Sequence, residues 1–261
     1  MTSSPENLAR HLARVPVHRA LIRALEQRLF AEEVLEHPVL DIGCGDGHYA
    51  AEAFSNGIDV GIDITWRIVT EARQNGPYRH LDVADGTRLP YADASFRTVV
   101  SNCVIEHIPD IDGLVQEIAR VLMPGGRFIF SVPGEHFTEM LFTVSWLGRI
   151  GLTHFAERYG RRWNRNAAHH HLDSPEVWRA RLSDCGLTVD RHTYYMSAEA
   201  TRAFEISHYY AVPSIAWRRL TGHWSLRPRR ARDSLACRWL SRYANEPWPI
   251  VGSCSFFVTH K

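Results

Sequence analysis

The spacing of apolar residues changes twice along the chain. From Val17 to Leu29 every fourth residue is apolar, which is the period of a helix. A preceding helix is indicated by Ser4, Pro5 and Glu6, which suit a helix start and are followed by Leu8 and Leu12. Two helices are therefore predicted before the first strand.

From residue 38 onward, short apolar runs alternate with segments of helical period. Strands are expected at 38–42, 59–63, 80–83, 97–101 and 127–132, and helices at 46–56, 65–75 and 111–123. Such alternation is typical of an α/β fold with a parallel sheet covered on both faces. Ligands of these sheets bind at the carboxyl ends of the strands.

After Pro133 this alternation stops. Residues 134–172 are a mixed segment rich in aromatics, arginine and histidine, which we interpret as an insertion near the ligand-binding edge. A helix is expected to begin at Ser174 and to end at Gly186, followed by strands at 187–190 and 254–258, and 198–247 reads as helical. We predict N-terminal helices over 1–37, a ligand-binding core over 38–133, and acceptor-binding insertions with the last strands over 134–261.

The two halves of the chain differ in net charge. Residues 1–133 hold 12 arginines and 18 acidic residues, a net −6, whereas residues 134–261 hold 18 basic and 11 acidic residues, a net +7. The basic half suits an acceptor with phosphate or carboxylate, or contact with anionic lipid or nucleic acid, and a solvated surface is the plain alternative. Five scattered cysteines, no secretory signal and no apolar run of membrane-spanning length predict a cytoplasmic protein.

The densest local motif runs from Val39 to His48 and contains Gly43, Gly45 and Gly47 directly after a strand. Glycines suit a turn that must approach a ligand closely. A dinucleotide fingerprint would place its third glycine at position 48, where this chain has histidine. The spacing favours a nucleoside with an amino-acid tail over a pyrophosphate.

Four ordered blocks carry a resemblance to a known family. They are LDIGCGDG at 40–47, DGTRLPYADASF at 85–96, VIEHIPD at 104–110 and RVLMPGG at 120–126. These blocks resemble the class I S-adenosylmethionine-dependent methyltransferases. The resemblance implies a Rossmann-like, doubly wound, mainly parallel seven-stranded sheet with an antiparallel last strand. It also implies S-adenosylmethionine as the cofactor.

Site residues follow from the resemblance block by block. It implies that Asp41, Gly43 and Gly45 meet the methionine portion and that Asp63 holds the ribose hydroxyls. Asp85 and Gly86 would lie against the adenine, and Asn102 with Cys103 under the sulfonium. The adjoining Cys44 and Ile64 complete the predicted cofactor set. Arg97 departs from the family's aspartate, and we expect only a local surface adjustment there.

An acceptor hydroxyl would need a base, for which histidine is suited. The candidates are His107, His136 and the run from His169 to His171. We predict His170 or His171 before His107, whose alternative is a structural role at a turn. Three adjacent histidines point in different directions, so no metal site is predicted.

Aromatic and arginine residues crowd the second half, where they either line an acceptor pocket or belong to the core and the solvated surface. The aromatic ones are Phe137, Phe142, Trp146, Phe155, Tyr159, Trp163, Phe204, Tyr209, Tyr210, Trp217 and Trp224. The arginines are Arg161, Arg162, Arg165, Arg218, Arg219, Arg227, Arg229, Arg230 and Arg232.

The predicted function is methyl transfer to a small, anionic or aromatic acceptor. Oxygen is the expected accepting atom of a sugar, polyketide, quinone or lipid-linked compound, while nitrogen and carbon stay open. No nucleic-acid partner is expected, peripheral membrane contact stays open, and the oligomeric state is not predicted. The alternatives are a cofactor-binding but non-catalytic partner subunit and a nicotinamide-dependent oxidoreductase. A nucleic-acid methyltransferase is a minor further option.

Overall fold

The computed structural model describes residues 4–221 and 235–261. The chain divides into two compact units. The core unit comprises Ala31–Glu135, Asn164–Thr193 and Cys254–Lys261, and the helical unit comprises Met1–Phe30, His136–Trp163 and Tyr194–Ser253. The predicted Trp224, Arg227, Arg229, Arg230 and Arg232 lie outside the described residues.

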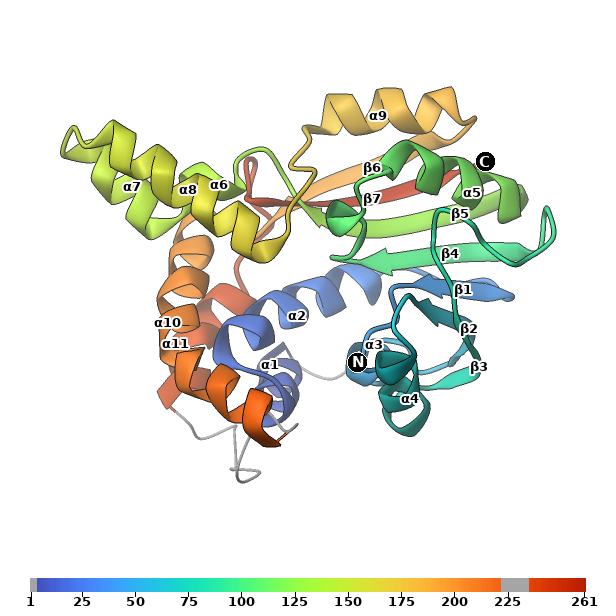
Figure 1. The fold of residues 1–261 in the computed structure, drawn as a ribbon, viewed down its shortest axis with the longest axis horizontal. Coiled ribbons are helices and arrows are strands. Elements are labelled where there is room, and N and C mark those ends of the chain that lie inside the picture. Colours follow the sequence, from blue (N-terminus) through green and yellow to red (C-terminus); the bar gives the residue numbers. More distant parts are fainter. Residues whose placement is uncertain (1–3, 222–234) are drawn as a thin grey trace. The chain divides into compact units, whose positions relative to one another are not determined.

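A seven-stranded sheet forms the centre of the core unit, in the order β3-β2-β1-β4-β5-β7-β6 (Figure 1). Its strands are β1 Val39–Ile42, β2 Ile58–Asp63, β3 Tyr78–Val83, β4 Phe96–Asn102, β5 Leu122–Pro133, β6 Thr188–Tyr195 and β7 Cys254–His260. The β1–β2, β2–β3, β1–β4 and β4–β5 pairs are parallel, whereas β7 runs antiparallel to β5. The predicted sheet class and antiparallel last strand are confirmed.

The chain order creates a switch point at β1. The strands β2 and β3 follow on one side of β1, and β4 then begins the other side. Connections leave in opposite directions at such a point, which opens a crevice at the carboxyl ends of β1 and β4. Asp41 of β1 pairs in register with Gly61 of β2 and Val100 of β4, so these strands end close together.

Helices of the core unit pack their apolar sides on this sheet. They are α3 His48–Ala53, α4 Trp66–Asn75, α5 Ile111–Val121 and α9 Pro175–Asp184, with a short 3-10 helix at Ile105–His107. In the core the Phe130 ring stacks between Phe128 and Phe257, at centroid distances of 4.5 and 4.8 Å, with the buried Trp178 of α9 beside it at 5.0 Å. Two of the predicted helices begin with a side-chain cap: Asp110 accepts a hydrogen bond from the Gly113 amide, and Ser174 from that of Val177.

The helical unit contains α1 Ser4–Arg14, α2 Val17–Phe30, α6 Phe137–Met140, α7 Phe142–Arg149, α10 Ala198–Thr221 and α11 Leu235–Ala244. The helix α8, Thr153–Ala167, begins in this unit. The α1 helix contacts α2 and α11, and α10 contacts α2, α6 and α7. The mixed segment predicted after the fifth strand is thus three consecutive helices. Within the described residues, no helix is long and apolar enough to cross a bilayer.

Candidate functional site

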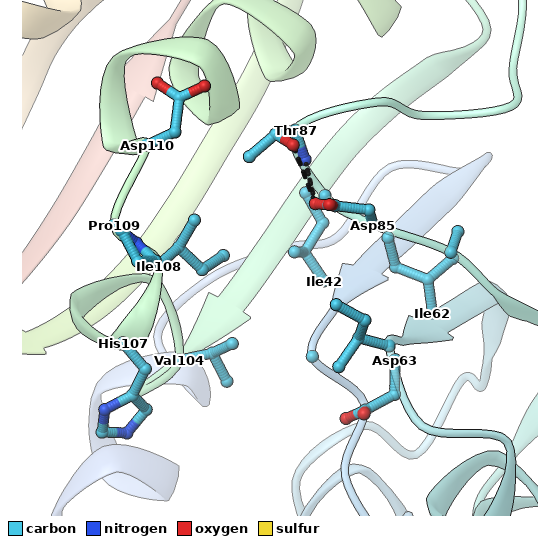
Figure 2. A pocket seen from close by; sticks show the side chains of 14 residues that line it. Ile42, Ile62, Asp63, Asp85, Thr87, Val104, His107, Ile108, Pro109 and Asp110 are labelled. Atoms are coloured by element: carbon cyan, nitrogen blue, oxygen red, sulfur yellow. Dashed lines mark hydrogen bonds between the residues drawn. The ribbon is translucent and has the colours of Figure 1, made fainter. Parts of the chain in front are cut away.

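A cavity of about 450 Å³ opens in the core unit at the ends of β1 and β2. Figure 2 shows two facing walls: Asp63, Asp85 and Thr87 lie on one side, and His107 and Asp110 on the other. Its apolar lining includes Ile42, Ile62, Ile64, Val104, Ile108 and Pro109. A mostly apolar cleft with a few carboxylates at strand ends is the usual form of a nucleoside site.

The glycine turn after β1 forms the base of this cavity. Gly43 has a φ of +77°, and a Cβ added there would lie 2.4 Å from the Val104 side chain. The Gly43 and Cys44 amides donate to the Ile62 carbonyl at 2.9 and 2.8 Å. Only glycine fits both this backbone conformation and this space, so the turn holds the backbone close to whatever occupies the cavity.

Asp63 stands at the carboxyl end of β2 on the cavity wall. Its two carboxylate oxygens accept weak backbone hydrogen bonds from the Gly45 amide at 3.3 Å and the Thr65 amide at 3.2 Å. Each oxygen keeps capacity for a further hydrogen bond, as a ribose diol requires. The Ile64 side chain beside it is 71% exposed and also lines the cavity.

Asp85 and Gly86 also line the cavity. Asp85 accepts hydrogen bonds from the Thr87 amide at 2.9 Å and the Thr87 hydroxyl at 2.8 Å (Figure 2). A Cβ on Gly86 would meet the Leu114 side chain at 2.7 Å. Because position 86 is glycine, the chain can pass close to Leu114 of α5 here.

Each part of S-adenosylmethionine can be matched to a part of the cavity. Its adenosine needs apolar surfaces for the ring and a carboxylate for the ribose, and its methionine tail needs backbone that approaches without a Cβ. The cavity supplies the isoleucines, Asp63 and the glycine turn. The residues present fit the cofactor.

Other predicted cofactor residues, Asp41 and Cys44 among them, are not on the lining of this cavity. Asp41 is buried and accepts a hydrogen bond of 2.6 Å from the Tyr78 hydroxyl. Burial, followed by the charge of Asp41, raises the pKa of Tyr78 well above its usual value. Burial likewise raises the pKa of the Cys44 thiol, with Asp41 and Asp63 adding to the shift, so this cysteine stays protonated at neutral pH.

Asn102 and Cys103 end β4. The Asn102 side chain is buried and accepts a 2.6 Å hydrogen bond from the Ser131 hydroxyl, and the Cys103 amide donates to the Ser131 carbonyl at 3.0 Å. The placement of these two residues under the sulfonium, and of Asp41 against the methionine portion, stays a prediction. Arg97 contacts Glu36 at 3.7 Å and the Pro124 carbonyl at 3.3 Å on the surface.

Several residues of the cavity lining were not predicted from the sequence, namely Ala84, Thr87, Val104, Ile108, Pro109 and Asp110. All of them lie within or beside the blocks at 85–96 and 104–110. Their position in those blocks was the available signal, because residues that flank a strand's carboxyl end share its edge of the sheet.

The candidate histidines lie at different places relative to the cavity. His107 lines the cavity, and its Nδ1 lies 3.0 Å from the Ala168 carbonyl oxygen. The His170 and His171 amides both donate to the Glu106 carbonyl, and the His171 ring contacts the Pro109 carbonyl at 3.3 Å and Asp173 at 3.6 Å. His136 belongs to the helical unit and contacts Glu139 at 2.5 Å. Of these histidines, His107 is the one on the cavity lining.

Glu106, His107 and His169 bring one potential metal-ligand atom each within 4.8 Å of one another. The two imidazole rings stack, with centroids 5.6 Å apart and an angle of 21° between the planes. Imidazole lone pairs lie in the ring plane, so stacked rings direct them along parallel planes rather than toward one ion. This arrangement is unfavourable for a coordination site that uses both rings. Burial lowers the pKa of His169 to about 4, with His107 adding to the shift.

Several predicted aromatics of the helical unit pack on one another. Trp163 lies 6.3 Å from Phe204 and 5.1 Å from His208 between ring centroids, and Phe137 is buried. Tyr159 donates to Glu205 at 2.5 Å and contacts the Tyr209 hydroxyl. Phe142, Trp146 and Phe155 are instead exposed.

Comparison with known proteins gives one family for the core. Residues 40–130 match the family described as a methyltransferase domain. The chain is 34% identical over 113 residues to a malonyl-acyl-carrier-protein O-methyltransferase of Enterobacter lignolyticus, covering 43% of each protein. It is 36% identical over 139 residues to an uncharacterized methyltransferase of Mycobacterium sp. (strain JLS), covering 48% of this chain and 50% of that protein. The chain thus spans at most about half the length of these curated relatives.

Solved structures share the fold across most of the chain. A possible histamine N-methyltransferase of Thermotoga maritima aligns with a TM-score of 0.56 at 16% identity, covering 94% of this chain and 91% of the other. A putative methyltransferase of Haloferax volcanii, in complex with the Trm112 activator, aligns with a TM-score of 0.56 at 20% identity, covering 90% and 88%. The match, the glycine turn and the sheet order identify residues 40–130 as a methyltransferase domain, within the Rossmann-like fold that the class I S-adenosylmethionine-dependent methyltransferases share.

Proposed function

We propose that this chain transfers a methyl group from S-adenosylmethionine to an oxygen atom of a small-molecule acceptor. The observation that carries the proposal is the placement of His107 in the lining of the cavity that fits the cofactor. The malonyl-acyl-carrier-protein relative, an O-methyltransferase by name, supports oxygen as the accepting atom. A sugar, polyketide, quinone or lipid-linked compound remains the proposed acceptor class.

The proposed cofactor contacts follow the cavity walls. Asp63 accepts the hydrogen bonds of the ribose diol, Asp85 and Gly86 border the adenine, and the turn at Gly43 and Gly45 approaches the methionine tail. The cofactor supplies a methyl group already activated by its bond to a positive sulfur. The protein's remaining task is to align the acceptor and to take up its proton.

We propose His107 as the base, in preference to His170 or His171. The Ala168 carbonyl can only accept a hydrogen bond, so the neighbouring Nδ1 of His107 carries the hydrogen. The neutral ring then presents a lone pair at Nε2. The Nε2 atom lies 3.6 Å from the Glu106 carboxylate, which is nearly fully buried and would stabilise the imidazolium formed when the proton arrives.

The test compares His107→Ala with His170→Ala. Radiolabelled methyl transfer would be measured over a panel of sugars, phenols, quinols and acyl thioesters, and binding of S-adenosylhomocysteine by calorimetry. We expect His107→Ala to lower kcat by roughly a hundredfold to ten-thousandfold, a typical contribution of a general base. Its affinity for S-adenosylhomocysteine should change by less than about threefold, because the ring is not among the proposed ribose or adenine contacts.

Outcomes of this experiment separate the alternatives. A larger loss in His170→Ala than in His107→Ala would restore the base predicted from sequence. Tight binding of S-adenosylhomocysteine without transfer to any acceptor of the panel would favour the non-catalytic partner subunit. A pH profile of kcat that loses its acidic limb in His107→Gln would identify this imidazole as the group that titrates.

A further inference from the structure

The helical unit exposes an unusual run of large apolar side chains on α7, α8 and their connection. Five of them lie within 14 residues, with exposed fractions between 42% and 56%: Phe142, Trp146, Ile150, Leu152 and Phe155. Single exposed apolar residues are common in proteins, but a contiguous group indicates a surface that contacts something else. We refer to residues 142–163 as the α7–α8 hairpin.

A three-residue turn joins the two helices of the hairpin. The α7 helix ends at Arg149 and α8 begins at Thr153, so Ile150, Gly151 and Leu152 form the connection. Gly151 has a φ of +80°, and a Cβ there would meet nothing within 4 Å. Further along, Gly160 packs α8 closely against Thr138 and Val144, which holds the two helices together behind the turn.

Basic residues follow the apolar ones along the same face of α8. Phe155, Arg158 and Arg162 are spaced by three and four residues, and all three line a hollow of about 370 Å³ with Leu147, Leu152 and Tyr159. The hairpin contains four arginines and one glutamate, and that glutamate, Glu157, pairs with Arg161 at 3.4 Å. Arg149, Arg158 and Arg162 are exposed.

We propose that the α7–α8 hairpin docks, turn first, on a lipid bilayer that contains anionic lipids. A helix rises about 1.5 Å per residue, so Arg158 and Arg162 lie roughly 5 and 10 Å along α8 from Phe155. Interfacial helices bury their apolar side chains about 5–10 Å deep, at the level where arginines meet lipid phosphates. The apolar turn and the arginines are thus separated by the distance that this boundary requires.

Other occupants fit this face less well. A second copy related by two-fold symmetry would bring the arginines of both chains together with one glutamate on each side. An acidic protein would be expected to meet arginines at the centre of the contact, whereas Ile150, Leu152 and Phe155 lie at or beside the turn here. The docking proposal is independent of the methyl transfer proposed above.

The experiment is co-sedimentation of the full chain with two kinds of vesicle, phosphatidylcholine alone and an equal mixture of phosphatidylcholine and phosphatidylglycerol. We expect the wild type to bind the mixed vesicles at least tenfold more tightly, since each basic residue near an anionic surface contributes roughly a fivefold gain. Ile150→Asn should weaken this binding by roughly tenfold, and so should Arg158→Glu combined with Arg162→Glu.

The matched control is Ile250→Asn. Ile250 lies outside the hairpin and is 95% exposed, more than Ile150 at 51%. Its replacement should change vesicle binding by less than about twofold. Calorimetric binding of S-adenosylhomocysteine should be the same in all variants and shows that each is folded.

Three results would overturn the proposal. These are equal binding to both vesicle types or to neither, an equal loss in the Ile150 and Ile250 variants, and vesicle-free self-association that Ile150→Asn abolishes. The last result would assign the hairpin to a second copy of the chain. Binding of an acidic acyl carrier protein that depends on Ile150, without vesicle binding, would likewise replace the lipid with a protein partner.

Discussion

Gly43 of the core unit and Gly151 of the helical unit have nearly the same backbone conformation, with φ values of +77° and +80°, but different surroundings. A Cβ at Gly43 would lie 2.4 Å from Val104, whereas a Cβ at Gly151 would meet nothing within 4 Å. The core turn is constrained by tertiary packing and the hairpin turn only by its own backbone. The family match lies within the core unit.

The largest expected effect comes from replacing each glycine by alanine. Gly43→Ala combines left-handed strain with overpacking against Val104 and should lower the free energy of unfolding by about 2–5 kcal/mol. It should also weaken S-adenosylhomocysteine binding by at least about a hundredfold, because the turn must move. Gly151→Ala should cost only about 1–2 kcal/mol and leave binding unchanged.

Chemical denaturation and calorimetry on both variants check this difference. Equal losses of ligand binding would show that the Gly43 turn has no special relation to the cofactor.

Acid should weaken the helical unit next. Burial lowers the pKa of His11 to about 4 and of His18 to about 3 in this unit, and it also lowers the pKa of His169 and His192 to about 4 in the core unit, so acid acts on both units. Their neutral forms are favoured by folding, so the stabilisation is present above the unfolded pKa near 6.5 and is lost as pH falls toward 4. Between pH 7 and pH 5 each should cost about 2 kcal/mol.

Hydrogen exchange at both pH values would locate this loss. Amides of α1 and α2 should lose protection at pH 5. His11→Gln should reduce the pH dependence in these helices, since an amide can still bond to Gln27, which now lies 3.0 Å from the His11 ring. Equal protection of α1 and α2 at pH 7 and pH 5 would contradict this account of acid sensitivity.

Asp63→Asn tests the polar half of the cofactor site. The amide can accept at one atom only, so we expect S-adenosylhomocysteine to bind roughly tenfold to a hundredfold more weakly. The control is Asp190→Asn, an exposed carboxylate on β6 that contacts His260 at 2.6 Å, where affinity should not change. Unchanged affinity in the Asp63 variant would contradict its proposed contact with the ribose.

The smallest expected effect is that of chelation. Because the stacked rings of His107 and His169 do not direct their lone pairs to one point, treatment with a chelator should leave methyl transfer within about twofold. A rate lost on chelation and restored by a divalent ion would show instead that Glu106, His107 and His169 bind that ion after rearrangement.

Much of the cavity lining could be predicted from sequence because its residues lie at strand ends in consecutive blocks. Gly43, Asp63 and Asp85 all follow apolar strand runs, and parallel strands bring their carboxyl ends to one edge. The contact between Tyr78 and Asp41 joins residues 37 positions apart, and no local pattern indicates it. The preference for His107 over His170 likewise depends on where the Ala168 carbonyl and the cavity lie in space.

The sequence by itself determined the α/β alternation, the glycine turn and the family, because these depend on local periodicity and on backbone conformations that few residues adopt. Only the tertiary structure decided which histidine faces the cavity and which apolar side chains of the helical unit remain exposed. Periodicity shows that a face is apolar but not what covers it, since covering is a property of distant segments. Phe137 is buried and Phe155 is exposed although both belong to the same aromatic-rich segment.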